Sequence, residues 1–148
     1  MGIIRKIYCH LLDYFRYSIL KKSYNGRFQC DSIFRMHPNS ELVLDKNLSE
    51  VRFGKNLYFS RNNIIRVMDG GGLKIGSNFF SNANLCMTVW GETEIGENVF
   101  LGPNVMVFDH DHDYKADGGI SSQIMKKGKI RIGSNVWIGG GVYYSFRN

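Results

Sequence analysis

The chain has 148 residues, of which 43% are hydrophobic, and a formal net charge of +6 at pH 7. These values predict one globular domain with a core and exclude general disorder. Lys and Arg are in excess in residues 1–27 and 121–148, whereas Asp and Glu are in excess between them. A nucleic-acid-binding domain would gather its positive charge on one face. We therefore expect no nucleic-acid partner and favour an anionic lipid surface or a phosphorylated cofactor.

The sequence contains three cysteines without a C-x-x-C pair, no apolar run long enough to span a membrane, and no recognisable signal peptide. It therefore indicates neither a disulfide framework nor a zinc knuckle. We expect a cytoplasmic protein that is not exported.

The N-terminal segment, residues 1–27, begins with the pattern of an amphipathic helix over residues 1–22. Two interpretations of this helix stay open. It either packs against the rest of the domain as a cap, or lies on an anionic cytoplasmic membrane face. Its apolar side chains recur at helical spacing, at Ile4, Tyr8, Leu11, Phe15 and Ile19.

From about residue 40 the sequence has no helical period. Four segments instead share a pattern of an apolar or aromatic residue, Gly, a polar residue, Asn and a second apolar residue. A six-residue beat continues within each segment, as from Ile75 to Ser81 and Met87. The leading residues of the four segments are 22, 20 and 37 positions apart, at Phe53, Ile75, Ile95 and Ile132.

This six-residue beat is typical of a β-solenoid. Each hexad gives one short strand and a corner, and three hexads close a triangular coil whose leading apolar residue points inward. Gly and Asn suit the corners because they adopt positive φ at little cost. We therefore predict that residues 28–148 form one all-β solenoid domain in which stacked coils share a core. The 37-residue step predicts an additional loop at about residues 110–129.

The loop contains the alternating stretch DHDHD, residues 109–113. Two His and three Asp are suitable metal ligands, but their alternation would point them to opposite sides, so we expect no metal. A solvated loop without chemistry is a second interpretation. A third is a general base, because a neutral imidazole can remove the proton of a hydroxyl that attacks an acyl group. A neighbouring carboxylate would orient that base, and the spacing does not choose among Asp109, Asp111 and Asp113.

Three segments resemble the hexapeptide-repeat acyltransferases, in particular their sugar and polysaccharide O-acetyltransferase branch, which includes the maltose and galactoside acetyltransferases. They are IGSNFFSNANLCM, IGENVFLGPNVMV and IGSNVWIGGGV, and with the loop they cover roughly residues 73–142. The resemblance implies a left-handed parallel β-helix, acetyl-CoA as acyl donor, and a homotrimer with active sites between subunits.

The same resemblance implies catalytic residues. The family has its general base seven residues after the Val of the G-P-N-V segment, which is His112 here, and His110 is the second candidate. Asn84 matches the second Asn of the family's N-x-N segment and would hold the acceptor or polarise the reacting group. The alternative makes Asn84 a corner residue of a coil, although Asn82 fits that corner better.

The resemblance also implies a cofactor site. Trp137, Gly139 and Gly140 match the segment on which the family lays the pantetheine arm of acetyl-CoA. Trp137 fits a packed surface aromatic as well. Lys127 lies in a basic run, residues 126–129, and would contact the phosphates of the cofactor, unless this run is only a solvated face.

We expect the acceptor to be a sugar hydroxyl of a capsule, exopolysaccharide or lipopolysaccharide intermediate, because a basic amphipathic N-terminus suits an enzyme at the inner membrane face. A small sugar of the maltose or galactoside type is the alternative. The family continues after the W-I-G-G-G-V segment with further hexads, so we expect a C-terminally truncated chain with its final coils missing. Such a chain would have an incomplete acetyl-CoA site and little activity. The alternative function is a non-catalytic β-helix remnant or an assembly subunit.

Overall fold

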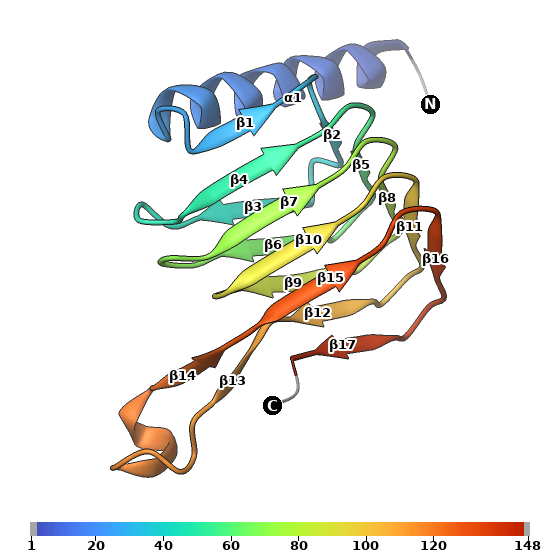
Figure 1. The fold of residues 1–148 in the computed structure, drawn as a ribbon. Helices are drawn as coiled ribbons and strands as arrows, with labels where there is room; N and C mark the ends of the chain where they lie inside the picture. The colour runs from blue at the N-terminus through green and yellow to red at the C-terminus, as the bar shows by residue number, and fades with distance from the viewer. Residues whose placement is uncertain (1–2, 147–148) are drawn as a thin grey trace.

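The computed structural model of the protein describes residues 3–146, so residues 1–2 and 147–148 of the two expected segments lie outside it. A long helix, α1 (Ile3–Ser23), lies across one end of a prism of short strands (Figure 1). The strands wind into a left-handed parallel β-helix from which one hairpin projects (Figure 1). This confirms the fold class that the repeats predict.

Three parallel sheets of five strands each form the sides of the prism. The first sheet contains, in order, β1 (Phe28–Cys30), β4 (Glu50–Phe53), β7 (Gly72–Ile75), β10 (Glu92–Ile95) and β15 (Lys129–Ile132). The second contains β2 (Arg35–Met36), β5 (Tyr58–Phe59), β8 (Phe80–Ser81), β11 (Val99–Leu101) and β16 (Val136–Ile138). The third contains β3 (Glu41–Leu44), β6 (Ile64–Val67), β9 (Cys86–Val89), β12 (Met106–Phe108) and β17 (Tyr143–Ser145).

The core is a stack of side chains inside the prism, and its register follows the repeats. Phe53 pairs with Ile75, Ile75 with Ile95, and Ile95 with Ile132 across neighbouring parallel strands. All four leading residues are at most 5% exposed. Strand side chains alternate between the two faces of a sheet, so the side chain before each leading residue points outward. The expected inward stack is therefore confirmed.

Asparagines form ladders along two of the corners, as the repeats predict. Their backbones have positive φ, a conformation that Asn tolerates better than most residues. The first corner aligns four of them, Asn56, Asn78, Asn98 and Asn135, and the second aligns Asn62, Asn84 and Asn104. Within each ladder, a side-chain amide donates to the next side-chain carbonyl over 2.9 to 3.3 Å. These contacts connect successive coils on the surface.

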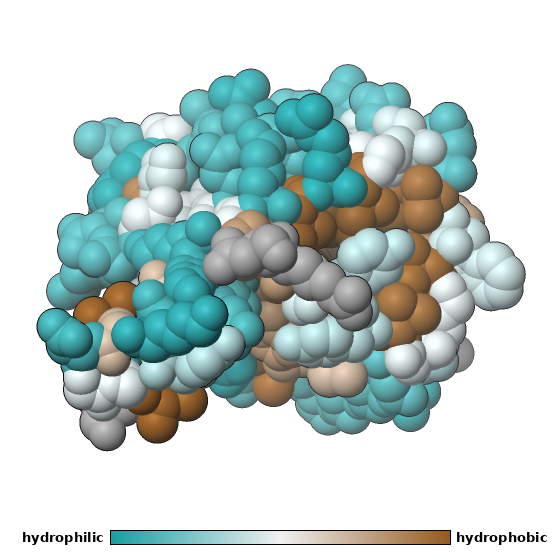
Figure 2. Space-filling model, turned by 60° about the horizontal axis from the view of Figure 1, so that its bottom comes forward, coloured by the Kyte–Doolittle hydropathy of each residue, from teal (hydrophilic) through white to brown (hydrophobic). Residues whose placement is uncertain are grey.

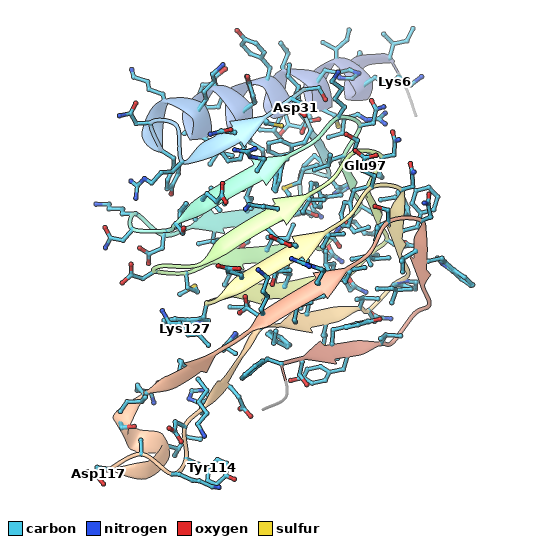
Figure 3. The ribbon with its side chains drawn as sticks, viewed as in Figure 1. Lys6, Asp31, Glu97, Tyr114, Asp117 and Lys127 are labelled. Carbon is cyan, nitrogen blue, oxygen red and sulfur yellow. The ribbon has the colours of Figure 1, made fainter. Side chains whose placement is uncertain are left out.

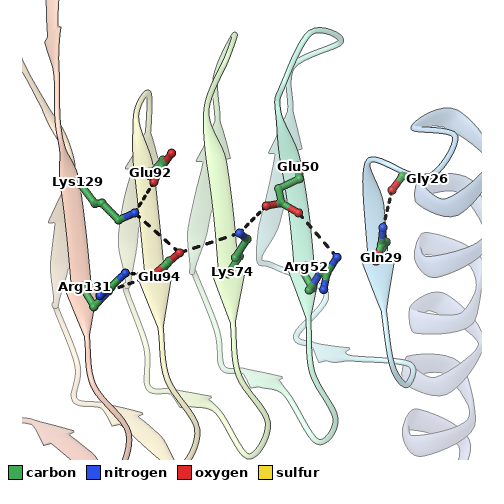
Figure 4. A network of polar contacts seen from close by, with 9 residues as sticks. All are labelled: Gly26, Gln29, Glu50, Arg52, Lys74, Glu92, Glu94, Lys129 and Arg131. Atoms are coloured by element: carbon green, nitrogen blue, oxygen red, sulfur yellow. Dashed lines mark hydrogen bonds and ion pairs between the residues drawn. The ribbon is translucent and has the colours of Figure 1, made fainter.

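The outer faces of the first two sheets differ in chemistry. The first carries alternating charges joined by ion pairs from Glu50 to Lys74, Glu92 to Lys129 and Glu94 to Arg131, over 2.6 to 2.9 Å (Figure 4). The second carries a row of aromatic side chains in parallel register: Tyr58, Phe80, Phe100 and Trp137. Opposite charges and aromatic rings on directly or diagonally paired residues both stabilise neighbouring strands.

Helix α1 covers the first coil, but not through the apolar stripe seen in the sequence. Asp13 is buried and accepts the N–H of Met36 over 3.1 Å. Arg16 donates to the carbonyls of Met36, Pro38 and Ser40. The stripe from Ile4 to Ile19 lies on the opposite, exposed side of the helix. The helix therefore caps the β-helix as one interpretation expects, with a polar contact at its centre.

The reason for this orientation is the surface that α1 covers. The end of a β-helix presents backbone N–H and C=O groups of its first coil, and these need partners where they are buried. Asp13 and Arg16 supply an acceptor and several donors, which apolar side chains cannot. Tyr17 and Leu20 pack beside them against the core. Within residues 3–146, no helix has the length and apolar character needed to cross a membrane.

At the other end of the described β-helix, β15, β16 and β17 are the outermost strands of their sheets. Figure 2 looks toward this end and shows hydrophobic side chains gathered there, next to hydrophilic ones on the neighbouring surfaces. Ile132 and Ile138 of this last coil keep about 5% of their surface exposed.

Candidate active site

The chain leaves the β-helix between β12 and β15 as a hairpin. It contains β13 (His110–His112), a short 3₁₀ helix η1 (Gly119–Ser122) and β14 (Met125–Lys127). β13 and β14 pair antiparallel, with His110 opposite Lys127 and His112 opposite Met125. The excursion lies where the 37-residue step predicts it, and Figure 3 shows Tyr114 and Asp117 near its tip.

Asp109 fixes the base of this hairpin. Its side chain is fully buried and accepts the backbone N–H of Trp90 over 2.7 Å, that of Gly91 over 3.2 Å, and the hydroxyl of Thr93 over 3.1 Å. Its own carbonyl accepts the N–H of Gly128 over 2.6 Å, where the chain returns to the β-helix. Three donors satisfy the buried carboxyl group, so Asp109 primarily holds the two arms of the hairpin in place.

His110 follows directly and is enclosed by aromatic rings. Its ring centre lies 6.0 Å from that of Trp90 and 5.9 Å from that of Phe108, and its side chain is 13% exposed. Its Nδ1 is 3.5 Å from Asp109 Oδ1. This pair is not aligned as a hydrogen bond, so Nδ1 is buried without a hydrogen-bond partner among the described residues.

His112 lies two residues further on the same face of β13, because strand side chains alternate. Its Nδ1 is also buried without a hydrogen-bond partner among the described residues. Asp111, between the two His, is exposed, and its Oδ1 accepts the backbone N–H of His112 over 2.8 Å. Two such buried imidazole nitrogens without a hydrogen bond are unusual, because buried polar atoms are normally hydrogen-bonded.

Both His side chains line a cavity of about 550 Å³ between the hairpin and the last coil. The other lining residues come from the hairpin and from β17 with the residue after it: Asp111, Tyr114, Lys115, Lys126, Tyr143, Ser145 and Phe146. The cavity thus combines two imidazoles with hydroxyl groups and ammonium groups. It can hold a polar, hydroxyl-bearing molecule beside a proton acceptor.

An ion pair stiffens the wall of this cavity. Asp113 Oδ1 lies 3.2 Å from Lys126 Nζ and also accepts the backbone N–H of Lys115. Partial desolvation acts to raise the pKa of Asp113, but the contacts with Lys126 and Lys115 outweigh it and lower the pKa below its ordinary value. Asp113 is therefore ionised at neutral pH and holds Lys126 toward the hairpin.

Asn84 does not line this cavity. Its backbone has a φ of 64°, and its side chain joins those of Asn62 and Asn104 in the corner ladder. The expectation that Asn82 takes the corner is wrong, because the backbone of Asn82 does not have positive φ and its Oδ1 accepts the N–H of Ala83. The corner needs a positive φ two residues later, at Asn84. A role of Asn84 toward the acceptor stays a prediction.

The expected cofactor residues do not line the cavity of the two His, and Lys127 also lies apart from the other three. Trp137, on the outer face of β16, is 79% exposed. Gly139 and Gly140 follow at the corner before β17, whereas Ser145 at the end of β17 lines the cavity. A Cβ at Gly139 would meet no atom within 4 Å, so this corner is open to solvent.

Lys127 lies on the opposite side of the prism from β16 (Figures 1 and 3). Its Nζ donates to the carbonyl of Asp69 over 3.1 Å and lies 5.4 Å from the centre of the Trp90 ring. Of the basic run, Lys126, which pairs with Asp111, lines the cavity of the two His instead. A single chain does not bring Lys127 together with Trp137.

Two residues of β17 that line the cavity, Tyr143 and Ser145, are not among the site residues predicted from the sequence. Tyr143 and Ser145 face outward from the third sheet, in register with Met106 and Phe108 of β12. They belong to the last, irregular hexad, and only the alternation of the strand signals that they face the hairpin. Within residues 3–146, no three His, Cys, Asp or Glu side chains are grouped in a way that could hold a metal ion.

Several curated proteins with the name acetyltransferase are similar to this chain. One of Saccharomyces cerevisiae is 37% identical over 73 residues, which are 49% of this chain and 37% of the relative. One of Dictyostelium discoideum is 30% identical over 121 residues, 78% of this chain and 62% of the relative. The galactoside O-acetyltransferase of Escherichia coli is 35% identical over 75 residues, 47% of this chain and 34% of that protein.

The chain therefore spans between about a third and two thirds of the length of these relatives. No protein-family model matches the chain, and no solved structure matches it significantly.

Proposed function

We propose that this protein is an O-acetyltransferase of the hexapeptide-repeat type, which transfers an acetyl group from acetyl-CoA to a sugar hydroxyl. The observation that carries the proposal is the pair of His side chains on one face of β13, which line the 550 Å³ cavity and whose buried Nδ1 atoms have no hydrogen-bond partner in residues 3–146. The similarity to proteins named acetyltransferases, over the same repeats, supports acetyl transfer as the reaction class.

His112 is the proposed general base. Acetyl-CoA, when bound, supplies the thioester and the sulfur leaving group. His112 accepts the hydroxyl proton while the new ester bond forms and the C–S bond breaks, and it then gives this proton to the departing sulfur. His110 is more enclosed, between Trp90 and Phe108, and suits a positioning role within the cavity.

Trp137 and Gly139 are proposed to hold the pantetheine arm of the donor. The open space beside Gly139 fits this role, because nothing in the chain itself occupies the place of a side chain there. These residues do not line the cavity of the two His within one chain. A homotrimer, in which one subunit supplies the His cavity and its neighbour the Trp137 face, would bring them together.

The proposed acceptor is a sugar of a polysaccharide or lipid-linked saccharide, and the protein is proposed to act in the cytoplasm. The cavity is lined mainly by polar side chains and has a volume of about 550 Å³, which suits a sugar residue. A small galactoside is the second candidate, and the name of the Escherichia coli relative is the specific observation that favours it.

The test is acetyl transfer by the purified protein, measured as thiol release with acetyl-CoA and either a galactoside or a polysaccharide acceptor. We expect His112→Ala to lower kcat/KM by about 10²–10⁴, with little change in the Kd for acetyl-CoA measured by calorimetry. His10→Ala, an exposed residue of α1 far from the cavity of the two His, is the matched control and should leave kcat/KM unchanged.

Three other outcomes would contradict parts of the proposal. A larger loss in His110→Ala than in His112→Ala would make His110 the base. Transfer to the galactoside alone would replace the polysaccharide acceptor. Absence of transfer to any acceptor by a folded protein would favour a non-catalytic β-helix.

A further inference from the structure

One side of α1 is apolar and has no partner within the described part of the chain. Its members recur at three- and four-residue spacing along the whole helix, and they are between 47% and 85% exposed. We call them the outer face of α1: Ile4, Ile7, Leu11, Tyr14, Phe15 and Ile19. Soluble domains rarely expose a continuous apolar face of this kind without a use for it.

The acidic and basic side chains of α1 lie in different places relative to the outer face. Asp13 is the helix's one acidic residue, and it is turned inward, where it is buried and lies 3.7 Å from Arg16. Lys6, Lys21 and Lys22 are all exposed. The outer face is therefore bordered by ammonium groups and has no negative side chain to oppose them.

The position of the helix makes the face accessible to a flat surface. Asp13 and Arg16 hold α1 against the first coil, so its outer face points away from the β-helix (Figure 1). Lys6, labelled in Figure 3, and Arg35 line a cavity of about 320 Å³ at the border between α1 and β2. Arg35 therefore adds positive charge beside Lys6, in a cavity that Asp13 also lines.

We propose that the outer face of α1 binds the surface of an anionic lipid bilayer, with the helix lying in the interface. Apolar side chains would enter the region between headgroups and acyl chains, and the lysines would contact lipid phosphates. This inference does not depend on the proposed acetyl transfer, because it rests on α1 and its surroundings only.

A second copy of the chain fits the outer face less well than a bilayer does. Two such faces in contact would bring lysines of one helix near lysines of the other, with no acidic side chain on either to compensate. The apolar arc also includes neighbouring positions such as Tyr14 and Phe15, and is therefore wider than the narrow seam of a helix pair. A broad apolar arc with basic borders is typical of a helix that lies on a membrane.

The test is flotation of the full chain with vesicles, without donor or acceptor. Vesicles of phosphatidylcholine with about one third phosphatidylglycerol should bind the protein, and vesicles of phosphatidylcholine alone should bind it more weakly. Leu11→Ser with Phe15→Ser should lower the partition coefficient at least tenfold, because both side chains are exposed and contribute to insertion. Lys21→Gln with Lys22→Gln should lower it by about fivefold per lysine at low salt.

The matched control is Ile120→Ser with Ile124→Ser. These residues are also apolar and exposed, by 61% and 50%, but lie in the hairpin at the other end of the molecule. Circular dichroism is used to check that each variant is folded. The proposal is overturned if the wild-type protein does not float with anionic vesicles, or if the hairpin control loses as much binding as the α1 variant. A loss of oligomer mass in the α1 variant, with no vesicle binding by the wild type, would assign the face to a second copy instead.

Discussion

Asp13 and Asp109 are both buried aspartates, and each fastens an added element to one end of the β-helix. Asp13 connects α1 to the first coil, and Asp109 connects the hairpin to the coils that precede and follow it. They differ in the number of donors that surround them. Asp109 accepts three hydrogen bonds, whereas Asp13 accepts one, from Met36, and lies near Arg16.

The difference has a consequence for the two attachments. Burial raises the pKa of Asp13 despite the hydrogen bond from Met36 and the charges of Arg16, His10 and Arg35, which lower it. The hydrogen bond and the nearby charges therefore do not fully offset the cost of burying the ionised side chain of Asp13. The number of donors around a buried carboxylate determines how firmly it holds an element, so the hairpin should be attached more firmly than the helix.

The largest effect is expected from a buried carboxylate that has no hydrogen-bond donor at all. The substitution Ile95→Asp would create one. Ile95 lies inside the stack between Ile75 and Ile132, where no polar group could pair with the new side chain. Lost burial and an unpaired charge should together destabilise the domain by more than about 5 kcal/mol. We expect no cooperative urea unfolding transition and no native circular dichroism spectrum. Ile95→Val, expected to cost about 1 kcal/mol, is the control, and a folded Ile95→Asp protein would contradict the inward stack.

Removal of the firmly held carboxylate should have the next largest effect. Asp109→Ala leaves the N–H groups of Trp90 and Gly91 and the hydroxyl of Thr93 without their acceptor. The free energy of unfolding should fall by about 3 kcal/mol or more, since each buried unpaired donor costs about 1–3 kcal/mol. Urea denaturation measures this change. Asp111→Ala, an exposed change on the same hairpin, should stay within about 0.5 kcal/mol; equal effects would show that Asp109 does not anchor the hairpin.

The weaker attachment should be sensitive to pH. The pKa of Asp13 is raised in the folded protein, so folding favours its protonated form. Its contribution to stability is then fully present below the ordinary pKa of 3.8 and is lost as the pH rises through the raised value. Protease cleavage within α1, measured from pH 4 upward, should become faster over this range. Asp13→Asn keeps an oxygen for the N–H of Met36 and should give a flatter profile; an unchanged slope would mean that another group is responsible.

The smallest change in stability is expected from a substitution in the solvent-exposed Asn ladder that contains Asn84. Asn84→Gly keeps a residue that tolerates positive φ and removes only the side-chain contacts with Asn62 and Asn104. The loss of stability should be about 1 kcal/mol or less, as in the control Asn62→Gly. If Asn84 also holds the acceptor, its variant alone should raise the acceptor KM. Equal KM values in the two variants would leave Asn84 with a corner role only.

The fold could be predicted from the sequence because its determinants are local and repeated. Ile75, Ile95 and Ile132 recur with the Gly and Asn that follow them, and each repeat independently indicates a strand, a corner and an inward direction. Even the hairpin could be located, because it interrupts the spacing of these residues.

The contacts at the two ends were less accessible to sequence reasoning. The stripe of α1 has a clear helical period, but the period does not say which side faces the domain, and buried backbone groups selected the side of Asp13 and Arg16. Among the three Asp of the hairpin, only the fold brings Asp109 beside Trp90 and Thr93. Whether His112 is the base remains a prediction, since its cavity is now described but its chemistry is untested.

The length of the β-helix along its axis sets the distance between α1 and the hairpin that carries the two His. Four strands of each sheet lie between α1 and the base of the hairpin, and strands in a sheet are about 4.8 Å apart, so their three spacings alone separate the two by about 14 Å or more. If α1 rests on a bilayer as proposed, the two His act at that height above it. The length of the β-helix would then set how far from the lipid a hydroxyl group must lie to reach the two His. A variant with one coil fewer would shorten this distance by about 4.8 Å.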